Sequence, residues 1–168
     1  MADASIDSRE FRSTMGHFAT GVTVVTTQVR HQRRGMTANS FTSVSLHPPL
    51  ILLCVDHSAS MRPFLEASEA FAINILAADQ RATSEAFARR GQNEAVMSGV
   101  PFHDGPLGSP ILEGVLAWAE CRMEAQYPGG DHTIVVGRVE SIAIERPGDE
   151  PLVHYLGGYR GLGGMIEP

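Results

Sequence analysis

Lysine is absent from this sequence, and all 13 of its basic residues are arginine. The chain therefore has no amine for a Schiff base or a pyridoxal-phosphate anchor, and no lysine for a phosphate-binding P-loop. Long apolar runs are missing too: no stretch approaches the roughly 18 apolar residues of a membrane span, and the N-terminus has no signal-peptide core. We expect a cytoplasmic protein that does not enter a membrane.

Cysteine is scarce, with only Cys54 and Cys121, which lie far apart in apolar stretches. We expect two free, buried thiols in a reducing compartment rather than a disulfide. No C-x-x-C, H-E-x-x-H or G-x-S-x-G pattern is present, which argues against a metal site and a serine hydrolase. No G-x-G-x-x-G follows a strand pattern, so a Rossmann unit is not expected.

Positive charge is in deficit, with a net charge of −6 over 168 residues. An acidic chain has no general attraction for nucleic acid or anionic membranes, so we expect neither as a partner. An anionic ligand would have to be held locally by arginines and backbone amides. The length and the 43% hydrophobic content predict a single domain, residues 1–168, with a proper core.

Strand patterns outnumber helix patterns along the chain. Asp7 begins a capping box, and Gly21 is expected to end the helix that follows. Residues 93–109 hold three glycines and two prolines, and we expect them to be mostly loop. The other expected elements are strands over residues 22–27, 36–46, 50–56, 71–76, 115–126, 133–144 and 152–159, and helices over 60–67 and 79–90. The strand over residues 50–56 is continuously apolar, so we expect it to be buried on both faces. Long strands joined by turns near the C-terminus favour an α+β, mainly β barrel with a few flanking helices over a doubly wound sheet.

Small polar side chains occupy both faces of the predicted strand Gly35–Leu46. Alternation places Thr37, Asn39 and Ser43 on one face and Ala38 and Ser40 on the other. Such a surface suits a flat heteroaromatic ring, because small side chains permit close approach while amides and hydroxyls meet the edge of the ring. The alternative is an edge strand whose hydroxyls are merely solvated.

The segment Cys54–Ser60 runs from a strand end into a predicted helix start, where free N–H groups could hold a phosphate with help from Ser58 and Ser60. The plainer alternative is that Ser60 only caps the helix. Arg89 and Arg90 could add positive charge, although arginines that end a helix are commonly just solvated.

Two further segments carry candidate side chains. In the run Gly129–Ile134, the glycines permit a tight turn that places His132 at the start of the next strand, where it could donate a hydrogen bond. The C-terminal run Tyr155–Arg160 offers aromatic rings and a guanidinium, and its plainer interpretation is a mobile chain end.

The order of these segments resembles the short-chain flavin reductase family, the reductase partners of two-component flavin monooxygenases. The resemblance covers residues 11–160, and the segments that carry it are Gly21–Thr26, Gly35–Leu46, Pro48–Leu50, Cys54–Asp56, Phe71–Asn74 and Gly129–Ile134.

This resemblance implies a split β-barrel of the Greek-key, FMN-binding type, built as a homodimer with flavin sites near the subunit interface. It implies FMN or FAD, NADH or NADPH, and a flavin-dependent monooxygenase that receives the reduced flavin. It also implies flavin-contacting residues, which are Thr37, Ala38, Asn39, Ser40, Ser43, Val44, Ser45, Cys54, Val55, Asp56, Ser58, Ser60, Phe87, Arg89 and Arg90. The residues that it implies near the nicotinamide are Tyr155, Tyr159, Arg160 and His132, and we assign His132 the orienting role in catalysis.

Three other functions stay open on the sequence. A non-enzymatic module could store or sense flavin on the same barrel. An enzyme resembling pyridoxamine-phosphate oxidases would share the barrel but should have a more basic phosphate pocket. A ligand-free structural dimer would leave the ordered match unexplained.

Overall fold

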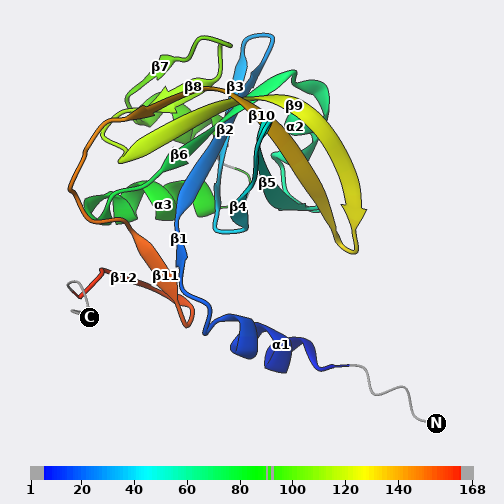
Figure 1. Ribbon diagram of the computed structural model, residues 1–168, viewed down its shortest axis with the longest axis vertical. Helices are drawn as coiled ribbons and strands as arrows, with labels where there is room; N and C mark the ends of the chain where they lie inside the picture. The colour runs from blue at the N-terminus through cyan, green and yellow to red at the C-terminus, as the bar shows by residue number, and fades with distance from the viewer. Residues whose placement is uncertain (1–5, 90, 92, 164–168) are drawn as a thin grey trace.

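Antiparallel strands dominate the computed structural model, which describes residues 6–89, 91 and 93–163 (Figure 1). The helical elements in this part of the chain are α1 (Ser8–Met15), α2 (Arg62–Ala67), the 3-10 turn η1 (Ala78–Gln80), α3 (Arg81–Ala88) and α4 (Asn93–Gly99). The strands are β1 (Thr20–Gly21), β2 (Thr23–Val29), β3 (Gln32–Ala38), β4 (Phe41–Leu46), β5 (Pro49–Asp56), β6 (Ala70–Ile75), β7 (Phe102–Asp104), β8 (Pro110–Leu112), β9 (Ala117–Gly129), β10 (His132–Ile144), β11 (Val153–Tyr155) and β12 (Gly158–Arg160).

Seven strands form one curved sheet in the order β3-β2-β6-β9-β10-β5-β4. The two edge strands, β3 and β4, are consecutive in the chain and are separated only by Asn39 and Ser40. The sheet therefore curls round until its edges approach each other, but no ladder joins β3 to β4. The fold is a split β-barrel, mainly β with few helices, as expected.

The predicted continuous strand over residues 36–46 is wrong, because the chain leaves one sheet edge at Ala38 and joins the other at Phe41. Ser40 secures the crossing: its hydroxyl donates to the Cys54 carbonyl at 2.8 Å, and the Cys54 N–H donates to the Ser40 carbonyl at 3.2 Å. The two strands on either side of Ser40 thus belong to opposite edges of the split.

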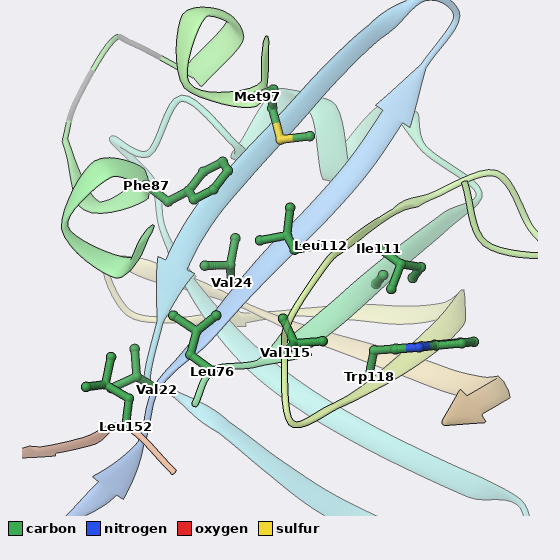
Figure 2. Close-up of a cluster of buried hydrophobic side chains, with 11 residues drawn as sticks. Val22, Val24, Leu76, Phe87, Met97, Ile111, Leu112, Val115, Trp118 and Leu152 are labelled. Carbon is green, nitrogen blue, oxygen red and sulfur yellow. The ribbon is translucent and has the colours of Figure 1, made fainter. Parts of the chain in front are cut away.

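Two clusters of buried apolar side chains fill the barrel and the space beneath its flanking helices. In the first, Phe87 of α3 lies with Val24 of β2 and Leu112 of β8, and Leu152 packs beside Val22 (Figure 2). α3 and α4 pack against β3, while α2 packs against β2. This packing places α3 along β3, with Ser84 beside Thr37 and Phe87 beside Gly35.

α1, β1, β11 and β12 form an arm that extends away from the barrel (Figure 1). β11 pairs with both β1 and β12 in a separate sheet. Asp7 caps α1 as predicted, accepting hydrogen bonds from the Arg9 and Glu10 N–H groups at 2.8 and 3.1 Å. The predicted helix end at Gly21 is wrong, because α1 stops at Met15 and Gly21 belongs to β1.

Two predicted helices are shorter than expected. α2 begins at Arg62 with Met61 as its N-cap, so Ser60 does not cap it. The segment before α2 instead forms turns, in which Ala59 N–H donates to the Asp56 carbonyl and Arg62 N–H donates to the Ala59 carbonyl. α3 ends at Ala88, because Arg89 is extended with a ψ of 131°.

Two further predictions are corrected. The segment predicted as loop, residues 93–109, contains α4 and β7. β5 is not buried on both faces: Ile51, Leu53 and Val55 are buried, while the residues between them are half-buried. Cys54 and Cys121 are free thiols, as predicted, but only Cys121 is buried, whereas Cys54 is half-buried; burial raises the pKa of Cys121 to about 12.

Candidate functional site

A cavity of about 360 Å³ opens where the two edges of the split barrel approach each other. It is bounded by the end of β3, the loop after β5, the C-terminal end of α3 and the β11–β12 hairpin. Its lining residues are Val22, Met36, Thr37, Ala38, Asn39, Asp56, Ser58, Ala59, Ser60, Phe87, Ala88, Arg89, His154 and Tyr159. The volume lies in the usual range for small-molecule sites, which are mostly apolar with a few placed polar groups.

The β3 wall carries the predicted residues Thr37, Ala38 and Asn39. The Thr37 hydroxyl donates to the Ser84 carbonyl at 2.6 Å, and the Asn39 amide donates to Thr20 Oγ1 at 3.3 Å. The Thr37 oxygen keeps lone pairs with which it could accept a hydrogen bond from a ligand. The wall is therefore a strand end whose polar groups are held in place by neighbouring elements.

The loop after β5 forms the opposite wall with Asp56, Ser58, Ala59 and Ser60. Asp56 Oδ1 accepts hydrogen bonds from the Ser58 N–H at 2.6 Å and from the Ser58 hydroxyl at 2.7 Å. Two of the donors that the sequence predicted for a phosphate, the N–H and the hydroxyl of Ser58, are thus directed at the Asp56 carboxylate. They would have to be shared with this carboxylate if an anion bound here.

The end of α3 supplies Phe87, Ala88 and Arg89. A Cβ atom at the buried Gly35 would lie 2.5 Å from the Phe87 ring, so only glycine lets β3 approach this side chain so closely. Arg89, at which the chain leaves the helix, also lines the cavity. Arg90, which was predicted beside it, lies outside the described residues.

The β11–β12 hairpin supplies Tyr159, which was predicted, and His154, which was not. The two are direct partners in the β11–β12 ladder, and their rings meet edge to face with centroids 6.0 Å apart. The sequence pattern predicts one strand over residues 152–159 and therefore does not reveal this partnership. The turn signal Gly157-Gly158 could have revealed it, because a hairpin that turns at Leu156–Gly157 places residues 154 and 159 opposite each other.

His132 lies at the start of β10, directly across the ladder from Asp56, and does not line the cavity itself. Gly130, with a φ of 72°, makes the preceding turn. The His132 Nδ1–H donates to Asp131 Oδ1 at 2.7 Å, and this contact lowers the pKa of the Asp131 carboxyl. The His57 N–H donates to the Asp131 carbonyl at 3.0 Å, which ties this hairpin to the loop after β5.

Several other predicted residues do not line this cavity. Ser43, Val44 and Ser45 lie on the edge strand β4, at an irregularity in its pairing with β5. Val55 is buried in the core, and burial raises the pKa of the Cys54 thiol. The predicted residues that lie outside the cavity are Ser40, Ser43, Val44, Ser45, Cys54, Val55, His132, Tyr155 and Arg160.

Tyr155 and Arg160 line a second cavity, of about 810 Å³, between the arm and residues 148–151. Each is a neighbour in the chain of His154 or Tyr159, and successive side chains of a strand point to opposite faces. The hairpin therefore presents one pair of side chains to the first cavity and another pair to the second.

The first cavity fits a flavin better than it fits a metal. Ala38, Ala59 and Ala88 leave room for a flat ring, and hydroxyl, amide and imidazole groups lie around it. Among the described residues, no group of three or more His, Cys, Asp or Glu side chains could hold a metal ion. In the same part of the chain, no helix is long and apolar enough to cross a membrane.

Comparisons with known proteins show which family this chain belongs to. The reductase component of 4-hydroxyphenylacetate 3-monooxygenase from Thermus thermophilus is 42% identical over 90% of this chain and 95% of its own. The FMN reductase (NADH) SmoA of Agrobacterium fabrum is 43% identical over 85% of this chain and 80% of its own.

A solved NADH:FAD oxidoreductase of Streptomyces globisporus, in complex with NAD and FAD fragments, superposes with a TM-score of 0.89. It is 38% identical, and the match covers 96% of each chain. The model of the flavin reductase like domain matches residues 15–163. The chain belongs to the flavin reductase-like domain family.

Proposed function

We propose that this chain is an NAD(P)H-dependent flavin reductase, which passes a hydride from a nicotinamide cofactor to FMN or FAD. One observation carries the proposal: segments far apart in the sequence, Thr37–Asn39, Asp56–Ser60 and Phe87–Arg89, meet around a single cavity. These are segments for which the sequence predicted flavin contacts. Relatives that match most of the chain are named FMN reductase (NADH) and NADH:FAD oxidoreductase.

Hydride transfer from a nicotinamide to a flavin needs little acid or base catalysis from side chains. A bound flavin supplies the hydride acceptor, and this chemistry belongs to the cofactors. The chain's own task is to hold two flat rings against each other at a reactive separation, about 3–3.5 Å. The β3 wall and Phe87 would hold one ring, and the hydrogen-bonding groups around it would set its orientation.

We assign His132 to the nicotinamide. It lies across the β10–β5 ladder from the cavity residue Asp56, and its Nδ1–H is bonded to Asp131. That bond fixes one ring nitrogen and leaves Nε2 for a second partner. A histidine in this position orients a ring by hydrogen bonding and is not an obligatory proton donor.

The reduced flavin would leave for a second protein. The Thermus relative is named as the reductase component of a monooxygenase, so we propose a flavin-dependent monooxygenase as the partner of this chain. We also propose a cytoplasmic location, because both cysteines are free thiols and a reducing compartment keeps them so.

We propose that the chain acts as a homodimer joined through its arm. α1 buries none of its residues, and Phe11, Met15 and Phe18 are 54%, 53% and 77% exposed. An isolated helix of eight residues is too short to be stable alone, so an apolar face of this kind needs a covering surface. A second copy of the chain would provide it.

Oxidation of NADH and of NADPH by the purified protein tests the proposal, with and without added riboflavin, FMN or FAD. We expect oxidation that depends on added flavin and saturates with it. Flavin that binds tightly without any turnover of either nicotinamide cofactor would overturn the reductase and leave a flavin-binding module.

A further inference from the structure

Tyr159 is held on three sides at the wall of the cavity. Its hydroxyl lies 2.9 Å from the hydroxyl of Ser84, a fully buried residue of α3. The Arg81 guanidinium lies 5.4 Å from the centroid of the Tyr159 ring, and the His154 ring meets it edge to face. The phenol is therefore a fixed support for the imidazole beside it.

The two imidazole nitrogens of His154 make no hydrogen bond to any residue that the structure describes. The residue lines the cavity and is half-buried, and its ring contact within the part of the chain that the structure describes is the one with Tyr159. A neutral imidazole carries one N–H donor and one acceptor nitrogen. Both are available to a molecule in the cavity.

Ser84 connects this wall to the β3 wall. Its carbonyl accepts from the Thr37 hydroxyl at 2.6 Å, while its hydroxyl bonds to Tyr159. One turn of α3 thus sets the positions of Thr37 and Tyr159 together. Because the two bonds use different atoms of Ser84, they can be removed separately.

We propose that His154 hydrogen-bonds the edge of the flavin ring, and that Tyr159 is the residue that positions it through Ser84. This inference rests on the proposed function, since it takes flavin as the occupant. His154 lines the same cavity as Val22, Ala38 and Phe87, and Val22 and Phe87 belong to one apolar cluster, against which an aromatic ring would fit. The loop after β5, with Ser58 and Ser60, bounds the other side of the cavity, where both Ser58 donors already bond to the Asp56 carboxylate.

Binding of riboflavin, FMN and FAD to the purified protein, followed by quenching of flavin fluorescence, tests the assignment. His154→Phe keeps a flat ring and removes both nitrogens. We expect it to weaken the binding of all three flavins by a similar factor, about three- to tenfold, as for one lost hydrogen bond. His154→Gln keeps a donor and an acceptor and should restore part of the affinity.

The positioning role of Tyr159 is tested by separate variants. Tyr159→Phe and Ser84→Ala break the same hydroxyl bond, while the Ser84 carbonyl that accepts from Thr37 stays in place. Each should weaken riboflavin binding by a smaller factor, and the double variant should be no worse than either single one. Additive losses, or no loss in either variant, would overturn the positioning role.

A direct contact has a spectroscopic signature. The imidazole nitrogen resonances of His154, identified by their absence from the His154→Phe spectrum, should shift when riboflavin is added.

The matched control for Tyr159→Phe is Tyr127→Phe, on an exposed part of β9. This variant should bind riboflavin as the unmodified protein does.

Three outcomes separate the inference from the proposed function. Unchanged riboflavin affinity in a folded His154→Phe variant refutes the contact while leaving the reductase intact. A loss confined to FMN and FAD would assign His154 to the phosphate and so refute the ring contact. If the unmodified protein bound no flavin at all, the proposed function itself would fall, and this inference with it.

Discussion

At the scale of single residues, the shape of the cavity depends on the close contact between Gly35 and the Phe87 ring. Gly35 lies against Phe87, where an added Cβ atom would be 2.5 Å from the ring. We expect Gly35→Ala to push Phe87 out of place, to lower the free energy of unfolding by about 1–3 kcal/mol and to weaken flavin binding. Urea unfolding and flavin titration measure the two effects.

Gly21→Ala is the matched control for this change. It also lies in a strand, and a Cβ there would meet no atom within 4 Å. Gly21→Ala should leave both quantities nearly unchanged. Equal effects of the two substitutions would show that the contact between Gly35 and Phe87 does not shape the cavity.

His132 gives a second prediction at this scale. Because we assign it to ring orientation, His132→Ala should raise the apparent KM for NADH by about tenfold and leave kcat largely intact. Steady-state rates at saturating flavin measure both constants. Loss of turnover that saturating NADH cannot restore would mean that His132 takes part in hydride transfer itself.

At the scale of elements, Arg146 ties the segment after β10 to η1 at the start of α3. Its guanidinium donates to both carboxylate oxygens of Asp79, at 2.9 and 3.1 Å, to Asp149 at 2.7 Å and to the Gly114 carbonyl at 3.0 Å. The bond from Arg146 holds the pKa of the Asp79 carboxyl below its ordinary value. A carboxyl with a lowered pKa in the folded state stabilises the fold above its unfolded-state pKa and loses this effect as pH falls through the folded-state pKa.

Asp79→Asn should therefore be less stable than the unmodified protein near pH 7, and the difference should be lost once the pH falls below the lowered pKa of this carboxyl. Urea unfolding at pH 7 and at an acid pH below that pKa measures it. The control is Glu113→Gln, an exposed carboxyl that makes no ion pair within the described residues. A difference of the same size at both pH values would remove the ion pair as its cause.

Sequence patterns predicted elements better than they predicted their ends. The capping signal at Asp7, the β-branched run of β2 and the two long strands β9 and β10 were all found, because each is decided by local chemistry. The strand expected over residues 36–46 was split instead, because its two halves pair with β2 and β5 at opposite edges of the sheet. Pairing partners are set by tertiary structure, which a local pattern does not contain.

The same limit explains the candidate site. Thr37–Asn39 and Phe87–Arg89 were predicted and meet at the cavity, whereas Ser43–Ser45 follow the chain to the far edge. His154 was missed because its importance comes from facing Tyr159 across a hairpin. Ser58 was expected to offer its donors to a phosphate, but the carboxylate of Asp56 already accepts both.

At the scale of the whole molecule, the proposed dimer forms through the arm. If a second copy covers the apolar face of α1, the protein should sediment at twice the mass of one chain. Phe11→Asp places a charge in this interface, so the variant should contain more monomer. Analytical ultracentrifugation measures the mass. Ser13→Asp, on the opposite face of α1, is the control; a dimer that persists unchanged in Phe11→Asp would place the interface elsewhere.

The central claim is that the cavity in the split of the barrel is where flavin is bound and reduced. Ala88→Trp tests it most directly, since Ala88 lines this cavity at the exposed end of α3, whereas Ala82, on the same helix, is exposed and does not line it. Flavin-dependent NADH oxidation should require at least about tenfold more flavin in Ala88→Trp and be unaltered in Ala82→Trp, with both variants folded. An unaltered flavin dependence in Ala88→Trp would contradict the claim and place the flavin at another site.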